Sequence, residues 1–206
     1  MIVTAVEPRR KSLSAIYVDG EFFGKLDTET LIENRISTGT EIDEDDLKEL
    51  VFKSEVRRAK EKALWLISYR DHTEGELFQK LSKDFSEEAA ASAVARMKEL
   101  RLTDDEAVAR RYAEELHRKH QSPQNIIYKL TQKGIDKDFA VEIVEELSID
   151  PVEEICALVE KKYQRKLCEE NGKKRVAAAL QRAGYRFGDI KSALNRYASC
   201  EEDYCD

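Results

Sequence analysis

The sequence predicts a mainly α-helical fold: three tandem three-helix repeats in an elongated, curved array, preceded by a small three-stranded β element built on a hairpin. Three observations support this fold class. Apolar residues recur with a period of 49 or 50 residues, which is typical of stacked repeats. Helix start and stop signals fall at matching places in each period, and an Asp-Gly pair separates two β-branched and aromatic runs near the N-terminus. The expected divisions are the strand-rich element with a leading helix (1–55), the three repeats (56–101, 102–149 and 150–198) and an acidic tail (199–206).

The predicted strands are centred on Asp19-Gly20. Residues 14–26, SAIYVDGEFFGKL, carry β-branched and aromatic residues on both sides of this pair. Asp and Gly tolerate the positive φ angles of a two-residue hairpin turn. The run IVTAVE before it predicts a third strand, and three strands are about the minimum for an independently stable sheet. We interpret this element as a cap on the helical part that follows.

From Asp27 onward the pattern becomes helical. LIENRI predicts a short helix, and Asp43 begins a longer one that runs through Glu61 into Leu66. Its charges alternate in sign, which is typical of a solvated helix with pairs of opposite charge four residues apart.

The repeat is clearest in the second helix of each unit. Thr73-EGELFQKL aligns with Ser122-PQNIIYKL at an offset of 49 (122 minus 73), and Gly172-KKRVAAAL follows at an offset of 50 (172 minus 122). The apolar positions of each copy predict one buried stripe. The expected helices are 59–70, 74–83 and 86–100 in the first repeat, 104–119, 123–133 and 137–148 in the second, and 152–169, 173–183 and 188–198 in the third.

Local signals predict where the helices of the second repeat begin and end. Thr103, with Glu106 three residues later, predicts a capping box, and Ser122-Pro123 predicts an N-cap followed by proline at the first helical position. Gly134 closes the second helix, since a left-handed residue commonly ends a helix. The first repeat is one residue shorter, so Phe85 takes the place of Ile135.

Composition indicates a helical, soluble and highly solvated protein. The net charge of −7 is spread unevenly. Residues 1–55 carry 7 Lys/Arg and 13 Asp/Glu, whereas residues 161–196 carry 11 Lys/Arg and 3 Asp/Glu. Such a chain is a poor non-specific DNA binder as a whole, because phosphates repel most of its surface. The sequence has neither a long apolar run nor a leader-like start, so we expect a cytoplasmic protein without a membrane segment. We also expect a monomer. In the cytoplasm the four cysteines, Cys156, Cys168, Cys200 and Cys205, should be reduced thiols.

The sequence contains no recognisable catalytic motif, and we expect neither an enzyme nor a cofactor. Asp104 and Asp105 point about 100° apart on a helix, so we interpret them as capping residues rather than metal ligands. His117 and His120 are three residues apart, but the pair lacks further ligands nearby. We therefore expect exposed polar histidines and no metal.

What remains is a set of cations that recurs in the three repeats. These residues predict a basic track along one side of the array, able to meet phosphates or acidic helices. The alternative is that they are ordinary solvated charges whose apolar stems cover the core. The candidate partner-binding residues are Arg70, Lys80 and Lys83 in the first repeat, Arg110, Arg111, Arg118, Lys129 and Lys133 in the second, and Lys173, Lys174, Arg175 and Arg182 in the third.

Three motifs in residues 59–197 resemble the RecX family of bacterial regulatory proteins. They are ALWLISYRDHTEGELFQKL, LTDDEAVARRYAEELHRK and SPQNIIYKLTQKGID. The family's arginine, Ser/Thr, acidic-Leu and Lys-Leu pattern is met by Arg70, Thr73, Glu76-Leu77 and Lys80-Leu81. Its L-x-DD-x-x-A-x-x-Y pattern is met by Leu102, Asp104, Asp105, Val108-Ala109 and Tyr112, with Val108 in place of the usual aromatic. The K-G-I turn is met by Lys133-Gly134-Ile135, whereas KDF stands at the corresponding turn of the first repeat.

The resemblance implies a modulator of the RecA recombinase. Such a protein binds the RecA filament on single-stranded DNA, typically in its helical groove, and blocks filament extension, strand exchange and co-protease activity. Weak direct binding to DNA is compatible with this role. A second hypothesis is a DNA-binding protein that uses its three-helix units like helix-turn-helix modules. A DNA binder should hold naked DNA tightly with a steep salt dependence, whereas a filament binder should gain strongly when RecA is present.

Overall fold

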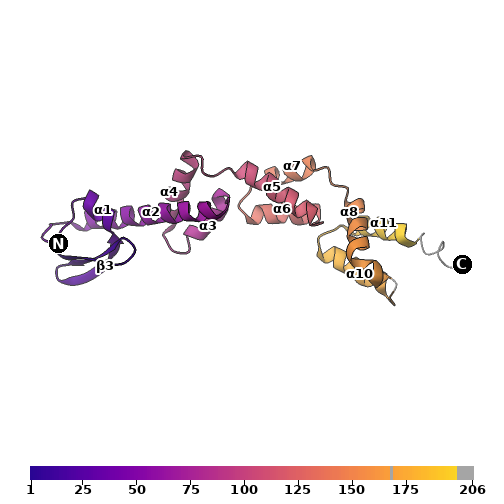
Figure 1. Ribbon diagram of the computed structural model, residues 1–206, viewed down its shortest axis with the longest axis horizontal. Coiled ribbons are helices and arrows are strands. Elements are labelled where there is room, and N and C mark those ends of the chain that lie inside the picture. The colour runs from indigo at the N-terminus through magenta and orange to yellow at the C-terminus, as the bar shows by residue number, and fades with distance from the viewer. Residues whose placement is uncertain (168, 199–206) are drawn as a thin grey trace. The chain divides into compact units, whose positions relative to one another are not determined.

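The computed structural model describes residues 1–167 and 169–198 (Figure 1). The chain forms two compact units, residues 1–104 and residues 105–206. The first unit holds the sheet and the first repeat, and the second holds the other two repeats. Cys168, Cys200, Cys205 and the predicted acidic tail lie outside the described residues.

The predicted three-stranded sheet is confirmed. Its antiparallel strands β1 (Val3–Pro8), β2 (Leu13–Val18) and β3 (Glu21–Asp27) follow one another in the order β1-β2-β3. Asp19 and Gly20 form the turn between β2 and β3 with φ angles of 49° and 89°, as the hairpin prediction requires. One face of the sheet forms a core with the helices that follow; its buried residues are Val3, Ile16, Val18, Leu26, Leu31, Ile42, Leu47 and Leu50.

The helix α2 (Glu44–Tyr69) follows the short α1 (Thr28–Glu33) and contributes to two cores. Leu47 and Leu50 in its first half pack against the sheet. Ala59 and Ala63 in its second half are fully buried in the core of the first repeat. The predicted long helix is therefore confirmed, and the predicted division between residues 55 and 56 falls inside it.

Three helices make up each repeat, as the period predicts. In the first, α2 packs with α3 (Glu74–Leu81) and α4 (Glu87–Glu99). The second contains α5 (Asp105–Arg118), α6 (Pro123–Gln132) and α7 (Lys137–Glu146). In the third, the first helix is interrupted: α8 (Pro151–Leu158), a π-helical turn η1 (Val159–Tyr163) and α9 (Gln164–Leu167) precede α10 (Gly172–Arg182) and α11 (Phe187–Ala198).

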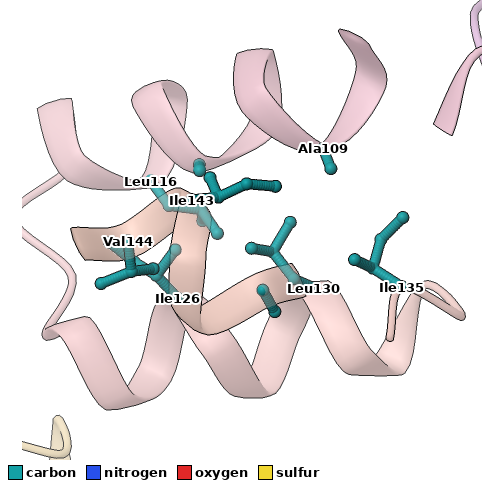
Figure 2. Packing of buried hydrophobic residues seen from close by; sticks show 9 residues of the cluster. Ala109, Leu116, Ile126, Leu130, Ile135, Ile143 and Val144 are labelled. Carbon is teal, nitrogen blue, oxygen red and sulfur yellow. The ribbon is translucent and has the colours of Figure 1, made fainter. Parts of the chain in front are cut away.

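The buried stripe of the second helix recurs in all three repeats. Figure 2 shows it in the second, where Ile126 and Leu130 of α6 point into the same core as Ile143 and Val144 of α7 and Ala109 and Leu116 of α5. The matched pairs are all nearly or fully buried: Leu77 and Leu81, Ile126 and Leu130, and Val176 and Leu180. Each repeat is thus a small helical core of its own.

The turn after the second helix is also repeated. The amides of Ile135 and Tyr185 donate to the carbonyls of Leu130 and Leu180, both at 3.2 Å, and Gly134 and Gly184 carry φ angles of 84° and 88°. In the first repeat, the Phe85 amide donates to the Leu81 carbonyl at 3.1 Å. This confirms that Phe85 takes the place of Ile135 in a turn one residue shorter.

The predicted capping box at Thr103 is wrong. Helix α5 begins at Asp105, and the buried Thr103 hydroxyl has no hydrogen-bond partner in the described part of the chain. Because the helix begins one residue later than predicted, Thr103 lies too early to cap it. The predicted cap at Ser122 is formed, since its hydroxyl accepts from the Asn125 amide at 3.2 Å. Thr73, which aligns with Ser122, caps α3 in the same way and accepts from the Glu76 amide at 3.1 Å.

Candidate partner-binding surface

Arg70 marks the end of α2 and is held in place by the next helix. Its guanidinium donates to the Glu76 carboxylate (Nη1 to Oε2, 3.2 Å), and the Glu76 amide is itself capped by Thr73. His72 lies in this turn, is only 3% exposed, and places Nδ1 2.8 Å from the Arg70 carbonyl oxygen. Since a carbonyl oxygen only accepts, Nδ1 carries the proton. Burial, with smaller contributions from the charges of Arg70 and Lys80, holds the pKa of His72 below its usual 6.5.

Lys80 and Lys83 lie on and just after α3 and form no ion pair in the described part of the chain. Lys80 is partly buried and lies close enough to His72 to lower the pKa of the imidazole. Lys83 is exposed, and it also lowers the pKa of Asp84, whose main partner is Lys62. The first repeat thus presents two cations without a carboxylate partner beside the anchored Arg70.

In the second repeat, the predicted cations divide between two sides of α5. Arg110 pairs with Glu106 at 3.1 Å and with Glu146 of α7, and it lies 6.0 Å from the centre of the Phe139 ring. The guanidinium of Arg110 therefore joins α5 to α7.

The other side of α5 carries cations around one carboxylate. The pKa of Glu115 is lowered chiefly by its hydrogen bond with Lys119, and the charges of Arg118 and Lys133 lower it further. Lys133 extends from the end of α6 over the Tyr112 ring at 4.8 Å. Arg118 is exposed and forms no ion pair with any described residue. Arg111 is exposed four residues before Glu115, and Lys129 donates to Gln121 at 3.1 Å.

The cations of the third repeat do not occupy the places of Lys129 and Lys133. The offset of 50 that aligns Leu130 with Leu180 places Ala179 and Ala183 there. The basic residues lie instead at the two ends of α10, with Lys173, Lys174 and Arg175 in its first turn and Arg182 in its last. The predicted correspondence of cations is therefore wrong for this repeat, because its helix carries alanines where α6 carries lysine.

A hollow of about 380 Å³ opens between the interrupted first helix of the third repeat and α10. Arg175 and Arg182 line it from α10, with Ala178 and Ala179 between them, and Lys166 and the half-buried Tyr163 line it from the other side. The Lys166 ammonium lies 5.8 Å from the centre of the Tyr163 ring. Glu169 is the one acidic residue that lines it, and it contacts Arg175 at 3.3 Å. Sequence reasoning missed Tyr163 and Lys166, although the basic run from 161 to 196 pointed to the region.

The prediction that His117 and His120 are exposed is wrong. Both are partly buried and face Glu154 of α8, with Nδ1 to carboxylate distances of 3.6 Å for His117 and 2.7 Å for His120. They therefore lie at the contact between the second and third repeats. Among the described residues, no group of three His, Cys, Asp or Glu side chains is placed to hold a metal ion.

Two further hydrogen bonds join these repeats. The Ser122 hydroxyl donates to the Ala183 carbonyl at 2.8 Å, and the Tyr185 hydroxyl donates to the His120 carbonyl at 2.9 Å. Burial raises the pKa of Tyr185 to about 12. A Cβ on Gly184 would lie 2.6 Å from the Ser122 hydroxyl, so the turn of the third repeat fits closely against the second.

Two family models match the chain, and both describe three-helix domains. The first three-helix domain of RecX matches residues 59–97, and the second matches residues 104–142. The regulatory protein RecX of Caldanaerobacter subterraneus is 31% identical to the chain over 197 residues, which cover 95% of this chain and 99% of that protein. The chain belongs to the RecX family of regulatory proteins.

Other RecX proteins extend the similarity. Regulatory protein RecX of Clostridioides difficile is 28% identical over 207 residues, covering 98% of each chain. A crystal structure of regulatory protein RecX aligns with a TM-score of 0.62 and 23% identity over 94% of this chain and 98% of that chain. RecX from Lactobacillus salivarius aligns with a TM-score of 0.57 and 24% identity over 69% of this chain and 96% of that chain. These structures share the RecX fold, and the family name describes a regulator rather than an enzyme.

None of the helices in the described part of this RecX-family chain is both long and apolar enough to cross a membrane.

Proposed function

We propose that this RecX-family chain binds the RecA filament on single-stranded DNA and thereby limits filament extension, strand exchange and co-protease activity. The observation that carries the proposal is a set of cations that lack a carboxylate partner in a chain whose net charge is −7. A partner that combines protein with phosphate suits such a surface better than DNA alone, because phosphates repel the acidic remainder. Among the described residues, the cations of this set that belong to the predicted surface are Lys80, Lys83, Arg118, Lys129, Lys174 and Arg182.

The paired cations have a different part in this proposal. Arg70 is fixed by Glu76 and Arg110 by Glu106 and Glu146, so their charges are already compensated within the fold. The lysines and arginines without such partners keep their donors available for phosphate oxygens or partner carboxylates. Affinity for the filament should therefore depend more on Lys80 and Arg118 than on Arg110.

Direct binding measurements test the proposal. Labelled single-stranded DNA is presented to the chain naked and coated with RecA, over a series of salt concentrations. We expect much tighter binding to the coated strand and a weakening of that binding, by about tenfold, in K80A/K83A/R118A. The control K25A/K48A/K53A removes the same charge from exposed lysines of the N-terminal part and should bind like wild type.

The competing function, direct DNA binding, is decided by the same measurements. Binding to naked DNA that is as tight as binding to the coated strand, with a steep salt dependence, would favour a DNA-binding protein. Equal losses in the two triple variants would contradict a defined contact surface and leave only general charge attraction.

A further inference from the structure

The first helix of the third repeat differs from those of the other two because it contains a π-helical turn. The corresponding helices α2 and α5 are α-helical throughout, whereas η1 inserts a wide turn at Val159–Tyr163. Such turns are rare and often lie at functional sites. Here the turn ends at Tyr163, whose side chain lines the hollow beside α10. This hollow also lies outside the two segments that match the RecX domain models.

The chemistry of the hollow is that of a polyanion site with one aromatic wall. Three cations line it, Lys166, Arg175 and Arg182, against the single carboxylate of Glu169. Arg175 and Arg182 are seven residues apart on one face of α10, about 10 Å along the axis. The alanines between them keep the floor of the hollow open. The surrounding segment, residues 161–196, has 11 basic and 3 acidic residues, so it attracts anions over a wider range.

We propose that this hollow binds a short stretch of single-stranded DNA, with phosphates at Arg175, Arg182 and Lys166 and a base against the Tyr163 ring. A positively charged groove combined with an aromatic side chain is the usual arrangement of sequence-independent single-strand sites. The contact of Glu169 with Arg175 does not oppose this. Both side chains are more than half exposed, and an exposed pair contributes little, so a phosphate can replace the carboxylate.

This site rests on the proposed function and adds to it: the third repeat would contact the DNA strand of the RecA filament. It also separates two kinds of cation within that repeat. Arg182 lines the hollow and makes no ion pair with any described residue, whereas Lys191 of α11 is exposed, does not line the hollow and is not part of the predicted surface. The two residues therefore form a matched pair for a charge-reversal test.

The experiment measures binding of the full chain to a fluorescent oligo-dT at low salt by anisotropy. Variants are R182E, K191E and Y163L, the last of which keeps an apolar side chain where Tyr163 packs against the core. Circular dichroism and thermal unfolding establish that each variant is folded. We expect R182E to weaken binding by about tenfold or more and K191E by less than about threefold, because Arg182 contacts the strand and Lys191 does not. Y163L should reduce the preference for the single strand over duplex DNA of the same sequence.

Three outcomes would overturn the proposal. Equal losses in R182E and K191E would mean diffuse attraction rather than a site. If Y163L prefers the single strand over the duplex as strongly as wild type does, no base stacks on the Tyr163 ring. Displacement of the oligonucleotide by inorganic phosphate at an equal phosphate concentration would make the hollow a site for free anions. Binding with the expected pattern, but without any effect on RecA, would keep the site and reject the proposed function.

Discussion

The hydroxyl of Tyr185 donates a hydrogen bond of 2.9 Å to the backbone carbonyl of His120, 65 residues earlier in the chain. Together with the bond from Ser122 to the Ala183 carbonyl, it fixes the turn of the third repeat against the α5–α6 turn of the second. The second repeat carries Ile135 where the third carries Tyr185, so its own turn has no hydroxyl to offer. This joint is therefore a particular property of the second and third repeats.

Replacing Tyr185 by Phe should loosen the joint while preserving its packing. The substitution removes a largely buried hydrogen bond and leaves the ring, so we expect the free energy of unfolding to fall by about 1 kcal/mol. Chemical denaturation monitored by circular dichroism measures it. The matched control is Tyr128→Phe, since Tyr128 is 59% exposed and its hydroxyl bonds only within its own helix. If both variants lose the same stability, the Tyr185 bond does not hold the repeats together.

Gly184 and Gly20 provide a test of the close fit at the same joint. Both have nearly the same positive φ angle, 88° and 89°, but a Cβ on Gly184 meets the Ser122 hydroxyl at 2.6 Å, whereas one on Gly20 meets nothing within 4 Å. Gly20→Ala should therefore cost only the backbone strain, about 1–2 kcal/mol. Gly184→Ala should cost the same strain plus about 1–3 kcal/mol for the forced displacement of Ser122. Equal losses in thermal or chemical unfolding would contradict this tight contact.

His72 should make the stability of the chain fall at mildly acidic pH. Its pKa is lowered in the folded state, chiefly by burial, so below its ordinary value of 6.5 the unfolded chain binds more protons than the folded one. The free energy of unfolding should decrease as the pH falls from 6.5, until the folded pKa is passed. His72→Asn, whose amide can donate to the Arg70 carbonyl in place of Nδ1, should remove that part of the pH dependence. If the stability of wild type and variant has the same slope just below pH 6.5, His72 is not the source of this pH dependence.

The sequence predicts most of the fold because its signals are local. The Asp19-Gly20 turn, the cap at Ser122 and the buried stripe of each second helix depend on residues close together in the chain. Thr103 failed as a cap because the helix begins one residue later than the capping pattern suggests. The prediction that cations occupy corresponding positions in all three repeats is wrong for the third, where Ala179 stands in the place of Lys129.

The contacts between the second and third repeats could not be predicted in the same way. Ser122 was assigned only as a cap, yet it also bonds to Ala183, 61 residues away. His117 and His120 were expected to be exposed, but Glu154 of the next repeat faces both. No local pattern predicts the π-helical turn at Val159–Tyr163 either. These features depend on how helices pack, which the period alone does not specify.

The most direct test of the central claim is RecA-mediated strand exchange with this chain titrated well below the RecA concentration. Our account predicts inhibition at a small ratio of this chain to RecA, since a regulator that limits filament extension does not need to cover the DNA. It also predicts that K80A/K83A/R118A requires a markedly higher concentration for the same inhibition than K25A/K48A/K53A. Strand exchange that is unaffected, or is inhibited only when the chain is abundant enough to coat the single-stranded DNA, would contradict it.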